Sequence, residues 1–284
     1  MSKEEKIAVY KNTIYLAKKG SYISPKGDEV SINDFDDKMI DGTKFYGKKV
    51  QINHQDLPRY ETEIKVINID CLYEAKEMID NGLNPAVLNM ASFHTPGGGV
   101  LKGSSAQEED IFRRSNIFKS LYQFSSIGLE FGIEQREERY PLQMNFGGIY
   151  TPSVTVFKGG KDVDYQLLEE PFHVDVITLA AVKNPPLDNG KIVSWAEITI
   201  KNKIKQILDI ALENGNDSLV LSAFGCGAYG TPPEQMAMLF ADVLASEEYQ
   251  GLFKVIHFAI IDLPSTNGQH NPNGNIVPFK KVFE

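Results

Sequence analysis

Residues 86–109 read AVLNMASFHTPGGGVLKGSSAQEE, and this stretch decides the fold. It begins with a short apolar run, passes through a loop with three successive glycines, and reaches a segment with helical spacing near Gln107. An apolar strand, a loop and a helix in this order are typical of an α/β unit, where ligands bind beyond the carboxyl end of the strand. The glycines allow the backbone to approach such a ligand closely and to point N–H groups at it.

The same alternation of apolar runs and helical segments extends from about residue 61 to near the C-terminus. The candidate strands are Ile64–Ile69, Ala86–Asn89, Val174–Ala181, Ser218–Phe224 and Val255–Ile261. The candidate helices are Leu72–Asn81, about Gln107–Leu121, Trp195–Glu213 and Pro233–Ala245. The strands are rich in Val, Ile and Leu and alternate only weakly, which favours burial on both faces. The fold class expected is therefore α/β, an α/β/α sandwich with a largely parallel sheet.

The first 60 residues have a different pattern. Residues 3–19 are spaced like an amphipathic helix that ends near Gly20, and Ser21–Ile32 read as a hairpin that turns at residues 25–28. Residues 33–60 are polar and are expected to be irregular. We interpret residues 1–60 as an extension packed on a main domain of residues 61–284.

Composition sets broad limits on function. The net charge of −9 argues weakly against a broad surface for nucleic acid or anionic membrane. The cysteines, Cys71 and Cys226, are far apart in the sequence, which fits a reducing cytosol better than a disulfide framework. Neither a signal peptide nor a run of about 18 apolar residues is present. We therefore expect a soluble, cytoplasmic protein with no membrane partner.

A second loop follows the candidate strand that begins at Ser218. It contains Ser222, Ala223, Phe224, Gly225, Cys226, Gly227, Ala228 and Tyr229, and it leads into a helix for which Thr231 is the expected N-cap. Small residues before a helix N-terminus favour an anion. Either loop alone is also compatible with a simple tight turn. Neither has the glycine spacing of a dinucleotide-binding motif or the Lys-hydroxyl pair of a P-loop, so a phosphate site of another kind is expected.

Adjacent carboxylates begin the helix after the first loop. Glu108 and Glu109 are suited to glycoside chemistry, in which one acid protonates the leaving oxygen, and a nearby diphosphate would favour the neutral acid. A purely structural role is the alternative. Ser105 and Glu108 match a capping box, whereas Glu109 and Asp110 would complement the helix dipole.

Taken together, Gly97-Gly98-Gly99, a spacer of seven residues and Gln107-Glu108-Glu109 resemble the signature of poly(ADP-ribose) glycohydrolases of the compact bacterial type. Other segments resemble that family in the same order along nearly the whole chain. These are the N-terminal segment Ile7–Val30, Ile69-Asp70-Cys71, Val174–Ala181, Leu221–Gly230 and Phe258–Asp262. The resemblance implies a three-layer α/β/α macrodomain sandwich with a central mixed sheet that binds ADP-ribose.

The resemblance also implies roles for individual residues. Glu109 would be the catalytic acid, and Glu108 would bind a ribose hydroxyl. The substrate-binding residues would be Asp70, Cys71, Asn89, Gly97, Gly98, Gly99, Val100, Gln107, Ser222, Ala223, Phe224, Gly225, Cys226, Gly227, Ala228 and Tyr229. Within this set, Asp70 would accept from the adenine amino group, Asn89 would reach the distal ribose, residues 222–228 would wrap the diphosphate, and Tyr229 would press against the terminal ribose.

The sequence departs from the family pattern at three positions. Tyr229 stands where Phe is expected, Thr231 where Asn or Asp is common, and Ser92 where many other macrodomain hydrolases have an asparagine. No cofactor or metal is expected, because His54, His94, His173, His257 and His270 show no ligand spacing. His94, inside the first loop, is a candidate for substrate contact.

The function expected is hydrolysis of O-linked ADP-ribose, on poly(ADP-ribose) or on protein, with Glu109 as acid and then base. Two alternatives stay open at this point. One is removal of ADP-ribose from nucleic-acid bases, and the other is an ADP-ribose-binding reader without hydrolysis.

Overall fold

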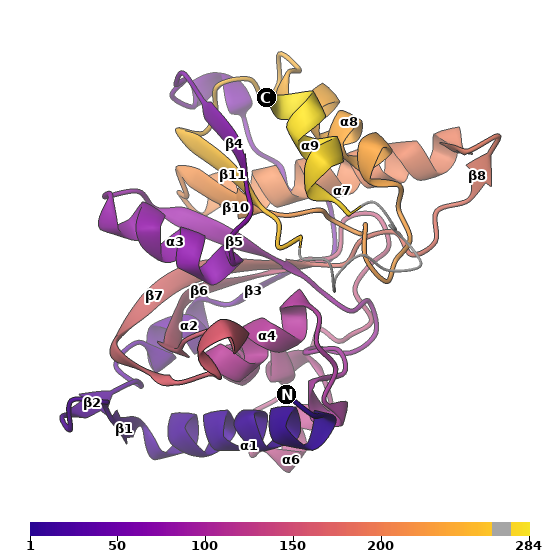
Figure 1. Cartoon of the computed structure of the whole chain (residues 1–284). Coiled ribbons are helices and arrows are strands. Elements are labelled where there is room, and N and C mark those ends of the chain that lie inside the picture. Colours follow the sequence, from indigo (N-terminus) through magenta and orange to yellow (C-terminus); the bar gives the residue numbers. More distant parts are fainter. Residues whose placement is uncertain (263–273) are drawn as a thin grey trace. The chain divides into compact units, whose positions relative to one another are not determined.

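The computed structural model describes residues 1–262 and 274–284, which fall into two compact units (Figure 1). Unit 1 consists of Met1–Phe45, Asn89–Leu142 and Ile149–Thr178. Unit 2 consists of Tyr46–Leu88, Gln143–Gly148 and Leu179–Glu284. Unit 1 thus combines most of the first 60 residues with the glycine loop, and the domain boundary at residue 60 stays a prediction.

Unit 1 holds the N-terminal helix and the glutamate helix. Its helices are α1 (Lys3–Lys19), α2 (Asp36–Gly42), α4 (Gln107–Arg114), α5 (Phe118–Leu121) and α6 (Ile127–Glu130), with 3-10 turns η2 (Val100–Lys102), η3 (Tyr122–Phe124) and η4 (Lys161–Val163). Its strands are β1 (Ser21–Ile23), β2 (Glu29–Ser31), β3 (Lys44–Tyr46), β6 (Gly148–Lys158) and β7 (Leu167–Leu179). In the main sheet of seven strands, β3, β6 and β7 follow in that order.

The expected N-terminal helix and hairpin are confirmed. Helix α1 begins at a capping box between Ser2 and Glu5 and ends at Gly20, whose φ of 84° lies in the left-handed region that favours glycine. Strands β1 and β2 pair antiparallel, with Ser21 opposite Ser31. Helix α1 packs against α4 and η2, and Figure 1 shows α1 beside α4, so the N-terminal helix supports the glutamate helix.

Two expectations for unit 1 are wrong, and one strand was not expected. Residues 33–60 are not irregular throughout, because they contain α2 and β3. Helix α2 has no side-chain cap. Asn116 and Lys119, which are distant in the sequence, donate to its Asp36. The helix expected to reach Leu121 ends at Arg114, because Ser115 is extended and bridges to Val156. Strand β6, which the sequence pattern missed, is buried along its whole length.

Unit 2 contains the rest of the main sheet. Its helices are α3 (Cys71–Asp80), α7 (Ser194–Glu213), α8 (Pro233–Leu244) and α9 (Ile276–Phe283), with the 3-10 turn η1 (His54–Asp56). Its strands are β4 (Glu63–Ile67), β5 (Pro85–Met90, whose last two residues belong to unit 1), β8 (Leu187–Asp188), β9 (Lys191–Ile192), β10 (Ser218–Leu221) and β11 (Val255–Ala259).

The parallel arrangement expected for these strands is confirmed in unit 2. Strands β5, β10, β11 and β4 follow in that order, and each neighbouring pair is parallel, with Ser218 opposite both Pro85 and Val255. All four residues of β10 are buried, as covered parallel strands require. Helix α9, which the sequence analysis did not predict, packs against β4 and α8.

The start of α8 differs from the expectation. Pro232, not Thr231, is the N-cap, and it makes no side-chain cap. The Thr231 hydroxyl is buried and has no partner among the described residues. Over the same residues, no helix is both long and apolar enough to cross a membrane.

Candidate active site

The loop after β5 is shaped by close contacts that only glycine allows. Gly97 has a φ of +76°, and a Cβ atom there would lie 2.6 Å from the ring of Phe112. Gly98 has a φ of +53°, and its Cβ would lie 2.6 Å from Oε1 of Glu109. Any side chain here would collide with the glutamate helix, so the triple glycine lets the loop lie directly on the two carboxylates.

Three consecutive side chains of α4 hold this loop. Oε1 of Gln107 accepts from the Met90 N–H at 2.8 Å. The Glu108 carboxylate accepts from the N–H groups of Ser92 at 2.7 Å and Gly97 at 2.9 Å. Side-chain oxygens at the helix N-terminus therefore bind the backbone N–H groups of the loop and tie the two segments together.

Glu109 completes the set from the other end of the loop. Its Oε1 accepts from the Gly99 N–H at 2.8 Å, and its Oε2 accepts from the Ala106 N–H at 2.8 Å. The N-cap of α4 is thus Ala106, whose N–H is bound by Glu109 at N3, and the capping box expected between Ser105 and Glu108 is wrong. The helix begins at Gln107, as expected, but Glu109 and not Glu108 makes the bond back to the N-cap residue.

Both carboxylates are buried. Glu108 is 3% exposed and Glu109 is 7% exposed. Burial raises the pKa of Glu108 to about 8, against the opposing effect of the N–H groups of Ser92 and Gly97. The neighbouring Glu109 charge raises this pKa further.

Arg113, one helical turn after Glu109, supports the loop through hydrogen bonds, and the sequence pattern did not single it out. Its guanidinium donates through Nη2 to the Ser104 carbonyl and through Nε to the Lys6 carbonyl at 3.3 Å, while its own carbonyl accepts from the Thr13 hydroxyl. Arg113 is fully buried and so ties the glutamate helix, the loop and α1 together. The available sequence signal was an arginine at i+4 from Glu109 on an amphipathic helix.

The other residues expected in the first loop have identifiable contacts. Asn89 is buried, and its Nδ2 donates to the Thr178 hydroxyl at 3.1 Å, while its Oδ1 has no partner among the described residues. Val100 is buried and donates its N–H to the Gly97 carbonyl at 3.0 Å. His94 is exposed and its ring lies edge-on to Phe93.

Asp70 and Cys71 lie at the start of α3, in unit 2. Asp70 is the N-cap, and its Oδ1 accepts from the N–H groups of Leu72 at 3.0 Å and Tyr73 at 3.1 Å. Cys71 is a buried free thiol. A capping role for Asp70 was not anticipated, and it fixes the carboxylate at the carboxyl end of β4.

The second loop folds on its own carbonyls. The N–H groups of Phe224 and Cys226 donate to Ser222 and Ala223, respectively, and Gly225 turns the chain with a φ of +75°. Burial raises the pKa of the Cys226 thiol, which removes it as a thiolate nucleophile at neutral pH. In the described part of the chain, the N–H groups of Gly227 and Ala228 have no partner, and both residues are exposed. They are suited to bind an anion.

The site residues expected from the sequence therefore form two groups, one in each unit. Asn89, Gly97–Val100 and Gln107–Glu109 come together in unit 1, and Asp70, Cys71 and Ser222–Tyr229 belong to unit 2. The described residues contain no group of three or more His, Cys, Asp or Glu able to hold a metal ion. His54, His173 and His257 bond to protein side chains, and His270 lies outside the described residues.

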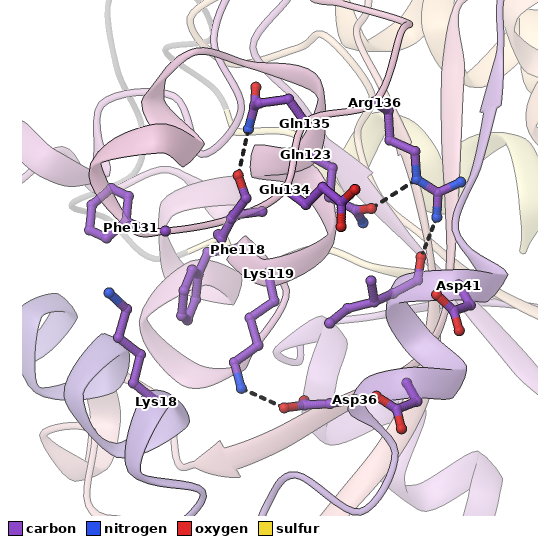
Figure 2. A pocket seen from close by; sticks show the side chains of 14 residues that line it. Lys18, Asp36, Asp41, Phe118, Lys119, Gln123, Phe131, Glu134, Gln135 and Arg136 are labelled. Atoms are coloured by element: carbon purple, nitrogen blue, oxygen red, sulfur yellow. Dashed lines mark hydrogen bonds and ion pairs between the residues drawn. The ribbon is translucent and has the colours of Figure 1, made fainter.

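A cavity of about 800 Å³ in unit 1 is formed by other residues (Figure 2). Figure 2 shows Phe118 and Phe131 on one side, Lys119 paired with Asp36, and Arg136 donating to Gln123. None of the residues expected at the site lines this cavity. The candidate active site is thus defined by the contacts of the glycine loop and the glutamates.

A comparison with family models matches residues 10–159 to the microbial-type PARG catalytic domain. PARG denotes poly(ADP-ribose) glycohydrolase. The matched segment is more than half of the chain and contains the glycine loop and both glutamates. The chain belongs to the microbial-type PARG family. None of the curated proteins compared with it matches.

Solved PARG structures resemble the chain over nearly its full length. The poly(ADP-ribose) glycohydrolase of Thermomonospora curvata bound to the inhibitor ADP-HPD is 28% identical, with a TM-score of 0.78 over 99% of this chain and 100% of that one. The PARG of Deinococcus radiodurans in complex with ADP-ribose is 27% identical, with a TM-score of 0.69 over 90% of this chain and 99% of that one. The mixed α/β fold is therefore that of PARG structures.

Proposed function

We propose that this chain hydrolyses the O-glycosidic bond at the anomeric carbon of the distal ribose in poly(ADP-ribose), or in protein-linked ADP-ribose, and releases ADP-ribose. Membership of the microbial-type PARG family supports glycohydrolase action on poly(ADP-ribose). The T. curvata and D. radiodurans structures bound to ADP-HPD and ADP-ribose support an ADP-ribose-containing substrate. The observation that carries the proposal is the pair of adjacent glutamates held against the Gly97–Gly99 loop.

We assign the general acid to Glu109. Its Oε1 adjoins Gly98 and Gly99, which are half-buried, whereas the Glu108 carboxylate bonds to the fully buried Gly97. Both carboxylates adjoin Gly98, and Glu109 also accepts from the N–H of the half-buried Gly99. Glu108, fixed by two N–H donors, is suited to orient a ribose hydroxyl.

The reaction then needs only one carboxyl group and water. Glu109 gives its proton to the glycosidic oxygen, the bond between this oxygen and the anomeric carbon breaks, and its electron pair leaves with the oxygen as a hydroxyl group. The ribose acquires oxocarbenium character. Water attacks the anomeric carbon and gives a proton to the Glu109 carboxylate, which restores the acid.

The other roles follow the two loops. Gly97–Gly99 would hold the distal ribose and Asn89 would bind one of its hydroxyls, while the amides of Ser222–Ala228 would bind the diphosphate. Tyr229 would press against the terminal ribose and Asp70 would accept from adenine. We also assign the fold to the macrodomains. We assign the location to the cytoplasm, because both cysteines are free thiols.

The test compares wild type, Glu109→Gln and Glu108→Gln on three substrates: poly(ADP-ribose), ADP-ribosylated protein and ADP-ribosylated DNA. The exposed Glu137→Gln is the matched control. We expect release from the polymer or protein, a loss of about 10²–10⁴-fold in kcat for Glu109→Gln, and no change for the control.

Other outcomes would revise the proposal. Binding of ADP-ribose without release from any substrate would make the protein a reader, and release from DNA alone would reassign the substrate. Full activity in Glu109→Gln together with its loss in Glu108→Gln would move the acid to Glu108.

A further inference from the structure

The hairpin β8–β9 and the start of α7 present an unusual set of exposed side chains. Trp195 is 59% exposed and Leu187 is 48% exposed. Lys183 and Lys191 are exposed as well, and neither makes an ion pair with a described residue. Residues 183–195 include two lysines and one aspartate, so this segment is net positive in a chain of net charge −9.

This segment is joined directly to the second loop. The Asn184 N–H donates to the Tyr229 carbonyl at 2.7 Å, and this hydrogen bond joins the segment before the hairpin to the second loop. The Val193 N–H donates to the Pro186 carbonyl at 3.0 Å, which closes the hairpin just before α7. Trp195 therefore lies two residues after the base of a hairpin, and the segment before that hairpin is hydrogen-bonded to Tyr229, the residue that we place against the terminal ribose.

The hairpin is also fixed to α8, although Figure 1 shows it extending beyond the end of α7. Oε1 of Gln235 accepts from the Ile192 N–H at 2.8 Å, and its Nε2 donates to the Gly190 carbonyl at 2.9 Å. An exposed aromatic ring on so well anchored a segment loses little conformational entropy when a partner stacks on it.

We propose that Trp195, with Lys183 and Lys191, forms a subsite for the ADP-ribose unit of the polymer next to the one being cleaved. This inference rests on the proposed function and names poly(ADP-ribose) as the substrate class. Each polymer unit has an adenine base and a diphosphate. An indole ring stacks on a base without regard to sequence, and lysines bind phosphates.

Trp195 is the sole tryptophan in the chain, so its fluorescence reports on this subsite without any catalysis. The measurement adds poly(ADP-ribose), and separately ADP-ribose monomer, to the Glu109→Gln protein. We expect the polymer to quench the Trp195 fluorescence. The monomer should leave the fluorescence unchanged, because it fills only the cleavage site. The double variant Lys183→Ala/Lys191→Ala should weaken this quenching at low salt and differ little from the parent at high salt.

Kinetics give the second readout. Trp195→Ala should raise KM for the polymer roughly tenfold, which matches the usual effect of one base–aromatic stack, with kcat unchanged. A peptide bearing a single ADP-ribose should be hydrolysed as by wild type, and Trp195→Phe should restore most of the polymer affinity. Tyr15→Ala is the matched control, because Tyr15 is 63% exposed on α1.

Failure of the subsite and failure of the proposed function are distinguishable. If wild type cleaves the polymer but saturating polymer leaves the fluorescence unchanged, or if Trp195→Ala behaves like Tyr15→Ala, the subsite is wrong. If Trp195→Ala instead abolishes a dimer in sedimentation, the patch binds a second copy and the subsite is likewise wrong. If wild type cleaves nothing, the proposed function fails, and quenching by the polymer alone would still support the subsite.

Discussion

The Ala106 N–H donates to Oε2 of Glu109 at 2.8 Å, so the residue that we assign as the acid also closes the N-terminus of its own helix. A carboxylate with both oxygens bound to backbone N–H groups cannot rotate away from the loop. Preorganisation of this kind removes much of the cost of placing the acid at the bond that it cleaves.

Gly98→Ala should disable the site. The new Cβ would lie 2.6 Å from Oε1 of Glu109, and the φ of +53° adds strain of about 1–2 kcal/mol. We expect activity to fall about 10²-fold through displacement of the carboxylate. Gly82→Ala is the control, because its φ is +78° but its Cβ would meet nothing within 4 Å. Equal activity in the two variants would contradict the close contact.

Arg113→Lys should loosen the loop although it keeps the charge. Lysine lacks the fork that reaches both the Ser104 and Lys6 carbonyls, so at least one of these acceptors would lose its donor. We expect the free energy of unfolding to fall by about 2–3 kcal/mol and kcat to fall as well. Urea unfolding and steady-state kinetics measure both, with the exposed Arg139→Lys as control. A variant with wild-type kcat would show that Arg113 does not position Glu109.

The raised pKa of Glu108 predicts a pH dependence of stability. Between the ordinary glutamate pKa near 4.3 and the folded value of about 8, the unfolded chain has lost the proton that the folded protein keeps. The stability of wild type should therefore fall as pH rises through this window and level off above pH 8. Glu108→Gln should lack this slope. Parallel urea midpoints of wild type and variant from pH 5 to 9 would contradict it.

Lys203 gives a prediction of the opposite sign. It is buried on α7, its ammonium has no partner among the described residues, and burial lowers its pKa to about 8. Between pH 8 and about 10.4 the unfolded chain holds the proton that the folded protein has lost, so stability should rise with pH there. Below pH 8 the burial penalty is fully present, and Lys203→Met should stabilise the protein by about 1–3 kcal/mol. The exposed Lys11→Met is the control, and a destabilised Lys203→Met would contradict the prediction.

Local sequence was sufficient wherever structure depends on neighbouring residues. The helix that starts after Ser2 and ends at Gly20 follows from its caps, and the apolar runs around Ala86, Ser218 and Val255 form parallel strands as expected. The glycine triplet and the glutamates also lie together, since only 11 positions separate Gly97 from Glu108. Short-range signals of this kind are present in the printed sequence itself.

Tertiary structure decided the rest, because the forces involved act between distant residues. Helix α2 is stabilised by the contacts of Asp36 with Asn116 and Lys119, about 80 positions away in the sequence, and it has no side-chain cap. Glu109, and not Glu108, bonds back to the N-cap residue Ala106 of α4, and burial raises the pKa of Glu108. The sequence therefore determined that two glutamates meet a glycine loop, while only the packed structure decided which carboxylate each backbone N–H binds.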